Sequence, residues 1–168
     1  MDLPRRKSIR LTDYDYSASG VYFITVCSRD RQPLFWDNAI SVTVGAATSR
    51  PPNAVPVPYA LTAYGKTVEQ AIINIPEHYT GVSVDKYVIM PDHIHLLLRI
   101  ENGGQLIAAP TVNTVVGQMK RWASKQAGIS LWQKSYYEHV IRNDTDFKET
   151  YTYIEGNPSR WLEKRGLL

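Results

Sequence analysis

The sequence predicts an α+β fold in which one antiparallel sheet has helices packed against one of its faces. The expected elements run strand, helix, strand, strand, helix, strand and then a terminal helix. The strand at 93–100 alternates between a wholly apolar face and a face with two histidines. A length of 168 residues with 43% hydrophobic content suits a single domain with a core. This order is the ferredoxin-like β-α-β-β-α-β plan with an added edge hairpin and C-terminal helix.

Composition indicates which partners and which cellular compartment suit the protein. Lys and Arg exceed Asp and Glu by 19 to 16, and the net charge of +3 is compatible with a polyanionic partner. The 11 tyrosines and 4 tryptophans suit stacking on unpaired bases, although most aromatic side chains simply build a core. The single cysteine cannot form an internal disulfide, and no apolar run reaches membrane-spanning length. We therefore expect one cytoplasmic domain over residues 1–168, without a membrane segment.

The first third of the chain is expected to hold an arm, a central strand and an edge hairpin. Residues 1–20 form a basic, irregular arm, which is either a solvated tail or a phosphate-binding segment. Its charge cluster consists of Arg5, Arg6, Lys7 and Arg10. Residues 21–27 are rich in β-branched and aromatic side chains and are predicted as a central strand. Residues 37–62 are predicted as an edge hairpin or loop with short strands near 40–44 and 57–62, because prolines exclude a helix there.

The remaining elements follow from hydrophobic periodicity and from stop signals. The strands are expected at 82–90, 93–100 and 137–141. The helices are expected at 62–78, 111–127 and roughly 145–157, the last within a C-terminal helix and tail at 144–168. Gly128 is a stop signal for the second helix, because glycine readily adopts the left-handed conformation that ends helices.

The strand at 93–100 carries the most informative pair of side chains. His93 and His95 are two residues apart and therefore share a face, while Ile and Leu side chains occupy the other. Two imidazoles side by side can chelate one metal ion. We expect the apolar face to pack under the helices and the histidine face to look out into an active site. The alternative is a pair of exposed strand histidines with no ligand.

The last expected helix has a core stripe and, beside it, two polar side chains. The stripe, spaced i, i+4 and i+7, consists of Phe147, Tyr151 and Ile154. Tyr153 and Asn157 are spaced i, i+4 and share a neighbouring face. Asn157 precedes Pro158, so we expect it at the helix end, where its backbone leaves the α region. Its amide oxygen could complete a metal site with the two histidines for Mg²⁺ or Mn²⁺.

A tyrosine beside a divalent-metal site indicates phosphodiester chemistry. A cation on a non-bridging oxygen neutralises developing charge, and the Tyr153 hydroxyl can attack the phosphorus in line. The resulting phosphotyrosine keeps the phosphoester bond, so the cut strand can be rejoined to another end. This combination therefore favours strand transfer over simple hydrolysis.

Simpler roles stay open for several of these residues. Tyr153 could be a packing tyrosine, and its rivals as nucleophile are Tyr136, Tyr137 and Tyr151. Asn157 could cap the helix end, alone or while it binds a metal. The basic side chains on the second predicted helix, which form either a solvated face or phosphate contacts, are Lys120, Arg121 and Lys125. Gln118 and Lys120 could also position the scissile phosphate.

Several blocks of this sequence together resemble one family. The strand motif Val-Ile-Met-Pro-Asp-His-Ile-His at 88–95 resembles the HUH endonucleases, which are defined by a His-hydrophobic-His pair. Within them the chain looks most like the REP-associated tyrosine transposases, relatives of the single-strand transposases of insertion sequences. The resemblance covers most of the chain, and its other blocks are 14–25, 116–121, 131–143 and 153–161.

The resemblance implies a set of roles and partners. Tyr153 would be the nucleophile, and His93, His95 and Asn157 would bind Mg²⁺ or Mn²⁺. Members of the family cut single-stranded DNA beside a short imperfect hairpin, which leaves a 5′-phosphotyrosine on the enzyme and a free 3′-OH. Asn157 stands where insertion-sequence relatives usually have Gln, which favours the REP-associated branch and a monomer over a homodimer. Residues 41–60 depart from the family's edge hairpin.

The sequence therefore predicts a metal-dependent, site-specific single-stranded DNA endonuclease and strand transferase. One alternative is a non-catalytic DNA-hairpin-binding protein derived from a transposase. Another is a plain phosphodiesterase that acts on RNA or small nucleotides. A covalent protein–DNA intermediate would distinguish the predicted strand transferase from both alternatives.

Overall fold

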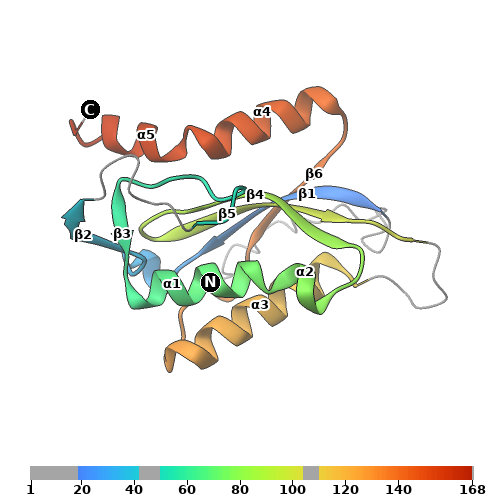
Figure 1. Ribbon diagram of the computed structural model, residues 1–168, viewed down its shortest axis with the longest axis horizontal. Coiled ribbons are helices and arrows are strands. Elements are labelled where there is room, and N and C mark those ends of the chain that lie inside the picture. The colour runs from blue at the N-terminus through green and yellow to red at the C-terminus, as the bar shows by residue number, and fades with distance from the viewer. Residues whose placement is uncertain (1–18, 42–49, 104–109, 168) are drawn as a thin grey trace, which may run out of the picture.

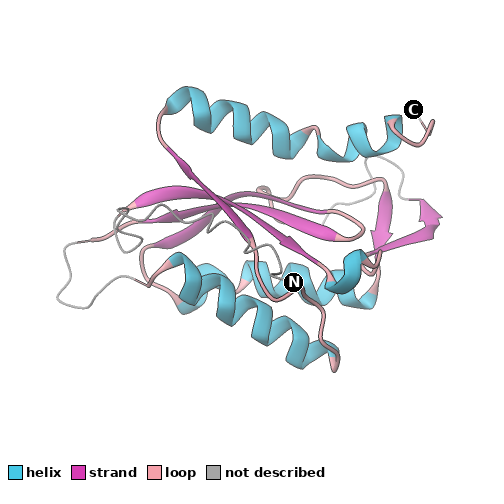
Figure 2. Cartoon of the chain, turned by 180° about the vertical axis from the view of Figure 1, so that it is seen from behind, coloured by secondary structure: helices cyan, strands magenta, loops and turns pink. Residues whose placement is uncertain are grey.

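A four-stranded antiparallel sheet lies between two layers of helices (Figures 1 and 2). The computed structural model describes residues 19–41, 50–103 and 110–167. The strands of the sheet are β1 (Gly20–Cys27), β4 (Val82–Ile89), β5 (His93–Ile100) and β6 (Tyr137–Ile141). Their order is β4-β5-β1-β6, so β5 separates the two strands that the first helices connect. This is the split β-α-β arrangement of the predicted ferredoxin-like plan, and the fold prediction is confirmed.

The apolar face of the sheet is covered by the first helical layer. This layer contains α1 (Ala63–Ile73), α2 (Ile75–His78) and α3 (Val112–Ala127). Ile94, Leu96 and Leu98 of β5 are fully buried beneath it. Thr62 and Thr111 cap the amino ends of α1 and α3 with their hydroxyl oxygens, and Gly128, at φ 70°, ends α3 as expected.

The single helix predicted at 62–78 is two helices. The backbone breaks at Asn74, and Pro76 stands in the first turn of α2. Proline has no N–H to donate, so it fits a helical first turn, where that group lacks an intrahelical acceptor, better than a helix interior. The helical spacing was therefore recognised correctly, but the position of the break was missed.

The second helical layer lies on the histidine face and consists of α4 (Asp144–Glu155) and α5 (Asn157–Glu163). The expectation that this face is free is wrong, because α4 packs across it and leaves His95 only 4% exposed. Lys86 of β4 fastens the helix: its Nζ donates to Oε1 of Glu155 at 2.9 Å and to the hydroxyl of Tyr151 at 3.1 Å. Burial opposes the charge of Lys86, but these two bonds raise its pKa above the ordinary value.

The predicted core stripe of the last helix is confirmed. Ile154 is fully buried, and Phe147 and Tyr151 pack against the core. The helix, however, ends at Glu155, and after Gly156 a new helix begins at Asn157. The prediction that the Asn157 backbone leaves the α region is therefore wrong.

The β2–β3 hairpin flanks one end of the sheet and has different bounds from those expected. Its strands are β2 (Trp36–Ser41) and β3 (Tyr59–Leu61), so the first begins earlier than 40. The indole N–H of Trp36 donates to the carbonyl of Ile89 at 2.7 Å, which ties β2 to the sheet. A short 3₁₀ turn, η1 (Arg29–Arg31), connects β1 to this hairpin. Residues 42–49 and the N-terminal cluster of Arg5, Arg6, Lys7 and Arg10 lie outside the described residues.

Candidate functional site

His93 and His95 lie on β5 at the end of the sheet next to the β4–β5 turn, and their ring centroids are 4.7 Å apart. Each histidine faces a residue of β1 across the antiparallel ladder: His95 faces Thr25, and His93 faces Cys27. Residues directly opposite on one face of a sheet have neighbouring side chains. The register of β1 and β5 therefore decides what surrounds the two imidazoles.

The Nδ1 atom of each histidine has a hydrogen-bond partner. Nδ1 of His93 lies 2.6 Å from Oδ1 of Asp92, and Nδ1 of His95 lies 2.8 Å from Oγ1 of Thr25. An ionised carboxylate only accepts, so Nδ1 of His93 donates this hydrogen bond and Nε2 is the ring nitrogen left for another partner. Nε2 of His95 is buried and has no hydrogen-bond partner among the residues that the structure describes. Such outer partners orient metal-binding histidines in proteins.

The electrostatics of the site keep His95 neutral. Burial, with smaller contributions from His93, Arg31 and Arg160, lowers the pKa of His95 to about 3, and Asp92 acts in the opposite direction. At neutral pH the imidazole is therefore unprotonated, which is the form that binds metals. Burial also raises the pKa of the Cys27 thiol. Cys27 is thus a protonated thiol beside His93 and does not compete as a thiolate ligand.

Tyr153 of α4 meets the histidines from the second helical layer. Its ring centroid is 5.5 Å from that of His95 and 5.9 Å from that of Phe23, both edge-on. The side chain is 45% exposed, so the ring is packed while part of it stays accessible. The two halves of the site that the sequence separates are therefore adjacent in space.

The start of α5 surrounds the backbone of Tyr153. Nδ2 of Asn157 donates to the Tyr153 carbonyl at 3.4 Å, which leaves the amide Oδ1 as the atom suited to a metal. The Arg160 guanidinium donates to the same carbonyl, and its Cζ lies 4.7 Å from the Tyr153 ring centroid. A Cβ at position 156 would come within 2.8 Å of Nη1 of Arg160, so glycine makes room for this arginine.

The donor set fits a divalent cation. Two imidazoles and one amide oxygen suit Mn²⁺, and Mg²⁺ with retained waters. In the described parts of the chain, no group of three or more His, Cys, Asp or Glu side chains is placed to hold a metal. A cation held by His93 and His95 would therefore need a ligand of another type, and Asn157 stays the residue that the sequence predicts for this role. The unpartnered, buried Nε2 of His95 is the observation that favours a ligand here.

The predicted helix α3 residues do not join this site. Nζ of Lys120 donates to the carbonyls of Gln133 and Lys134, at 2.7 and 3.2 Å, and burial lowers its pKa. Gln118 lines a cavity between α3 and the α1–α2 pair, on the opposite side of the sheet from the histidines. Arg121 and Lys125 are exposed on α3 in that same layer.

The rival tyrosines have other surroundings. The hydroxyl of Tyr151 accepts from Lys86, and Tyr136 packs against the core. Tyr137 is 45% exposed, and its ring lies 6.4 Å from that of Phe23. The ring of Tyr153, in contrast, directly contacts the ring of His95.

Four residues of the site were missed by sequence reasoning. Asp92 directly precedes His93, and Arg160 follows Tyr153 by two helical turns, so their spacing carried a usable signal. The positions of Thr25 and Arg31 depend on strand register and on the η1 turn, which no local pattern encodes.

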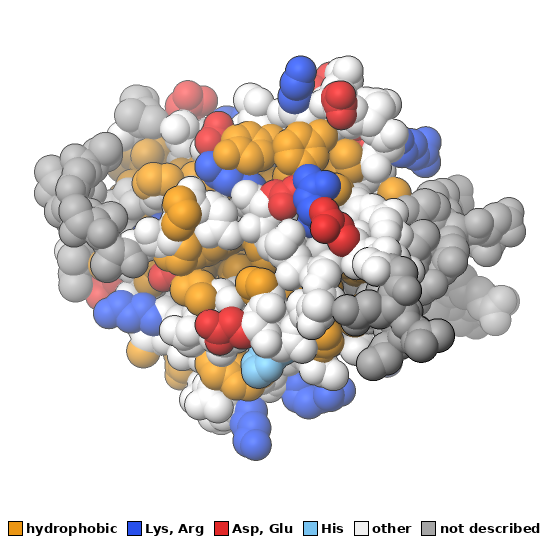
Figure 3. Space-filling view, turned by 45° about the vertical axis from the view of Figure 1, so that its right-hand side comes forward, with side chains coloured by type: hydrophobic (Ala, Val, Ile, Leu, Met, Phe, Trp, Pro, Cys, Tyr) orange, Lys and Arg blue, Asp and Glu red, His pale blue; other side chains and the backbone are white. Residues whose placement is uncertain are grey.

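On the face seen in Figure 3, acidic and basic side chains are interspersed rather than gathered by sign. Arg31 and Arg160 act electrostatically on His95 and thus place positive charge where an anionic ligand would bind.

Replacing Thr25 by Val should weaken metal binding without unfolding the protein. Val has a similar shape but removes the hydrogen bond that orients His95, and outer-partner mutations typically cost about 10- to 100-fold in metal affinity. Titration of Mn²⁺ followed by electron paramagnetic resonance measures the change. The matched control is Thr67→Val, because Thr67 makes its hydrogen bond on α1 in the other layer. Equal affinities for Thr25→Val and the wild type would show that Thr25 does not orient a metal ligand.

Proteins of two organisms are similar to this chain in sequence. No family profile matches the chain. An uncharacterised protein of Haemophilus influenzae is 31% identical over 93% of this chain and 89% of its own length. A REP-associated tyrosine transposase of Escherichia coli K12 is 23% identical over 62% of this chain and 61% of its own length.

A solved structure gives the same fold. The REP-associated tyrosine transposase bound to a REP hairpin superposes with a TM-score of 0.60 at 20% identity, over 100% of this chain and 76% of that one. No helix in the described ranges has the length and apolar character needed to cross a membrane. The distant homologue from Escherichia coli and the structural neighbour of this chain are thus both REP-associated tyrosine transposases.

Proposed function

We propose that the protein is a metal-dependent, site-specific single-stranded DNA endonuclease and strand transferase that acts next to DNA hairpins. The observation that carries this proposal is the contact between Tyr153 and His95, whose rings are 5.5 Å apart. A tyrosine hydroxyl beside a pair of imidazoles, one of which has a buried Nε2 without a partner among the described residues, combines a nucleophile with a candidate cation site.

The cleavage step is a balanced transesterification. The Tyr153 oxygen attacks the phosphorus of one phosphodiester, and the bond from phosphorus to the 3′ oxygen breaks. The proton lost by the Tyr153 hydroxyl ends on the 3′ oxygen, which leaves as a 3′-OH. The downstream strand stays attached to Tyr153 as a 5′-phosphotyrosine. Attack by another 3′-OH on this ester reverses the step and joins a new end. No oxidant, reductant or hydrolytic water is required.

The residues around Tyr153 have distinct proposed roles. His93 and His95 through Nε2, and Asn157 through Oδ1, would hold Mg²⁺ or Mn²⁺, which when bound supplies charge neutralisation at the phosphate. Thr25 and Asp92 orient the imidazoles through their Nδ1 atoms. Arg160, which covers the Tyr153 ring, and Arg31 provide positive charge for the DNA backbone.

The proposed substrate is a single strand that flanks a hairpin. The solved structure with the same fold is bound to a REP hairpin, and we propose the same kind of ligand for this chain because of that similarity. We further propose that the protein acts as a monomer in the cytoplasm, since one chain brings Tyr153 and both histidines together.

The proposal is tested with an imperfect-hairpin oligonucleotide of the REP type that carries single-stranded flanks. In Mg²⁺ or Mn²⁺ we expect a covalent protein–DNA species in denaturing gels and a released fragment that ends in a 3′-OH. The matched reaction contains a chelator and should give neither product. Tight hairpin binding with no adduct in any divalent metal would instead support the non-catalytic binding protein, and turnover without an adduct would support a plain phosphodiesterase.

A further inference from the structure

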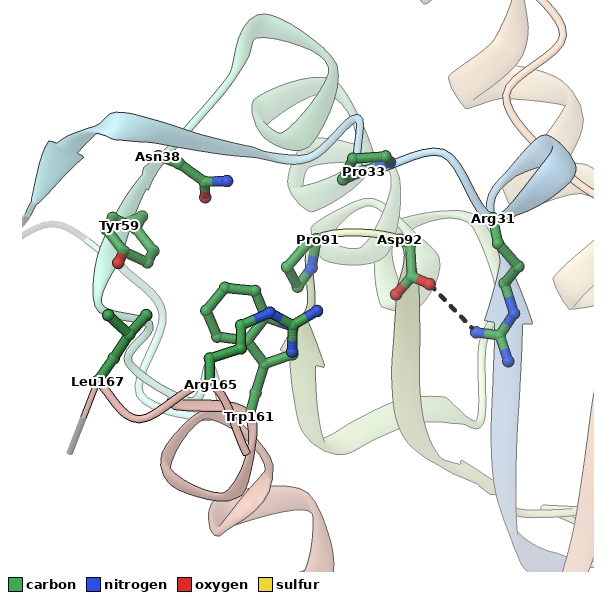
Figure 4. Close-up of a pocket in the computed structure, with 9 residues that line it drawn as sticks. All are labelled: Arg31, Pro33, Asn38, Tyr59, Pro91, Asp92, Trp161, Arg165 and Leu167. Carbon is green, nitrogen blue, oxygen red and sulfur yellow. Dashed lines mark ion pairs between the residues drawn. The ribbon is translucent and has the colours of Figure 1, made fainter. Parts of the chain in front are cut away.

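A cavity of about 450 Å³ lies between the β2–β3 hairpin, the β4–β5 turn and the C-terminal end of α5 (Figure 4). This volume is in the range of small-molecule sites, roughly 300–1,000 Å³. The side chains that matter here are Arg31, Asn38, Tyr59, Asp92, Trp161 and Arg165, and together they define the Trp161 pocket. None of these side chains is used by the proposed chemistry as nucleophile or metal ligand.

Aromatic side chains form a platform in the Trp161 pocket. The Trp161 ring is 5.0 Å from Trp36 and 6.3 Å from Tyr59, in both cases edge-on, so its neighbours fix its orientation. The Arg165 guanidinium lies 3.9 Å from the Trp161 ring centroid. Nucleobases stack on tryptophan rings and on arginine planes alike. Figure 4 shows the Asn38 amide on the other wall, where it has a donor and an acceptor for the edge of a base.

Two features, the side chain of Asp92 and helix α5, link the Trp161 pocket to the candidate active site. Asp92 lines the pocket, and its Oδ1 accepts a hydrogen bond from Nδ1 of His93. Its other oxygen, Oδ2, lies 3.5 Å from Nη1 of Arg31. Helix α5 is the second connection, because Asn157 and Arg160 contact Tyr153 while Trp161 lies in the pocket. A strand held at Tyr153 therefore has the pocket beside it.

We propose that the Trp161 pocket binds one unpaired nucleotide of the DNA strand beside the cleavage site, with the base on the Trp161–Arg165 stack. This inference rests on the proposed function for the identity of the strand. Two arginines, an aromatic platform and a side-chain amide match the phosphate, the ring face and the ring edge of a nucleotide. A nucleotide held there would fix the direction in which the single strand enters the site.

The test is a binding cycle between a side chain and a base. The probe is a fluorescent imperfect-hairpin oligonucleotide of the REP type with single-stranded flanks, and the protein carries Tyr153→Phe so that only binding is measured by anisotropy. Each flank nucleotide is replaced in turn by an abasic site. We expect one position at which the abasic change weakens binding about 5- to 100-fold, as the loss of one stacked base does.

Trp161→Leu should weaken binding of the intact probe by a similar factor and reduce the abasic penalty at that position to less than about 2-fold. Trp122→Leu is the matched control, since Trp122 lines a cavity in the opposite helical layer and should keep the full abasic penalty. Asn38→Ala and Arg165→Ala are exposed-surface variants that test the pocket if Trp161→Leu fails to fold, and both should reduce the same penalty.

The outcomes separate this inference from the proposed function. If the wild type forms an adduct but every abasic penalty is unchanged in all three pocket variants, the nucleotide site is overturned and the proposed catalysis stands. If no adduct forms but one flank position couples to Trp161, the nucleotide site stands and the catalytic proposal fails.

Discussion

Replacing Tyr153 by Phe should abolish the covalent protein–DNA adduct while hairpin binding survives. The variant keeps the ring that packs on His95 and Phe23 and loses only the hydroxyl. Loss of a nucleophile removes catalysis as a unit, so we expect adduct formation to fall by at least about 10³-fold. Because the side chain is 45% exposed, the dissociation constant should change by less than about 3-fold. Denaturing gels measure the first effect and anisotropy the second.

The matched control is Tyr151→Phe on the same helix. Tyr151 accepts a hydrogen bond from Lys86, so its loss should cost about 1 kcal/mol in the free energy of unfolding and leave adduct formation intact. Urea denaturation measures this cost. An adduct that persists in Tyr153→Phe and disappears in Tyr151→Phe would reassign the nucleophile.

Replacing His95 by Ala should remove metal binding and cleavage together. His95 combines a buried, unpartnered Nε2 with a strongly lowered pKa, so it is the side chain in the site best prepared to bind a cation. Since even an outer partner is worth about 10- to 100-fold, removing the ligand itself should lower Mn²⁺ affinity by at least about 100-fold. Isothermal titration with Mn²⁺ gives the affinity, and the hairpin assay gives the adduct yield.

His139→Ala is the control for His95. His139 lies on β6 and pairs with Asp146 at 3.0 Å near the start of α4, away from any predicted metal role. It should lose some stability but keep Mn²⁺ affinity within about 2-fold of the wild type. Unchanged Mn²⁺ affinity in a folded His95→Ala protein would mean that the histidine pair is structural.

The sequence predicted the elements whose local pattern is strong. Alternation along β5 placed His93 and His95 on one face, and the spacing in α4 separated Tyr153 from the core stripe. Both signals are local, because side-chain direction follows directly from the period of a strand or a helix. The order of the strands then followed from the ferredoxin-like plan and is confirmed.

Features that depend on long-range contacts were not predictable in this way. The alternation in β5 shows that one face is apolar, but it does not say that α4 will cover the other and bury Leu97. The partner of His95, Thr25, follows from the register with β1, which the two strands set jointly. The helix breaks at Asn74 and Gly156 each lie just before a proline in the first turn of the next helix. Their exact positions depend on how the two helices on either side of the break pack against the sheet. The metal and DNA roles of the site residues stay predictions.

The most direct test of the account is the identity of the residue that carries the DNA. The wild-type adduct is formed on the hairpin oligonucleotide in Mg²⁺, digested with nuclease and protease, and analysed by mass spectrometry. The account predicts a single modified peptide with a nucleotide 5′-phosphate ester on Tyr153, while Tyr136, Tyr137 and Tyr151 stay unmodified. A modification on any other residue, or a cleaved strand with no modified peptide, would contradict it.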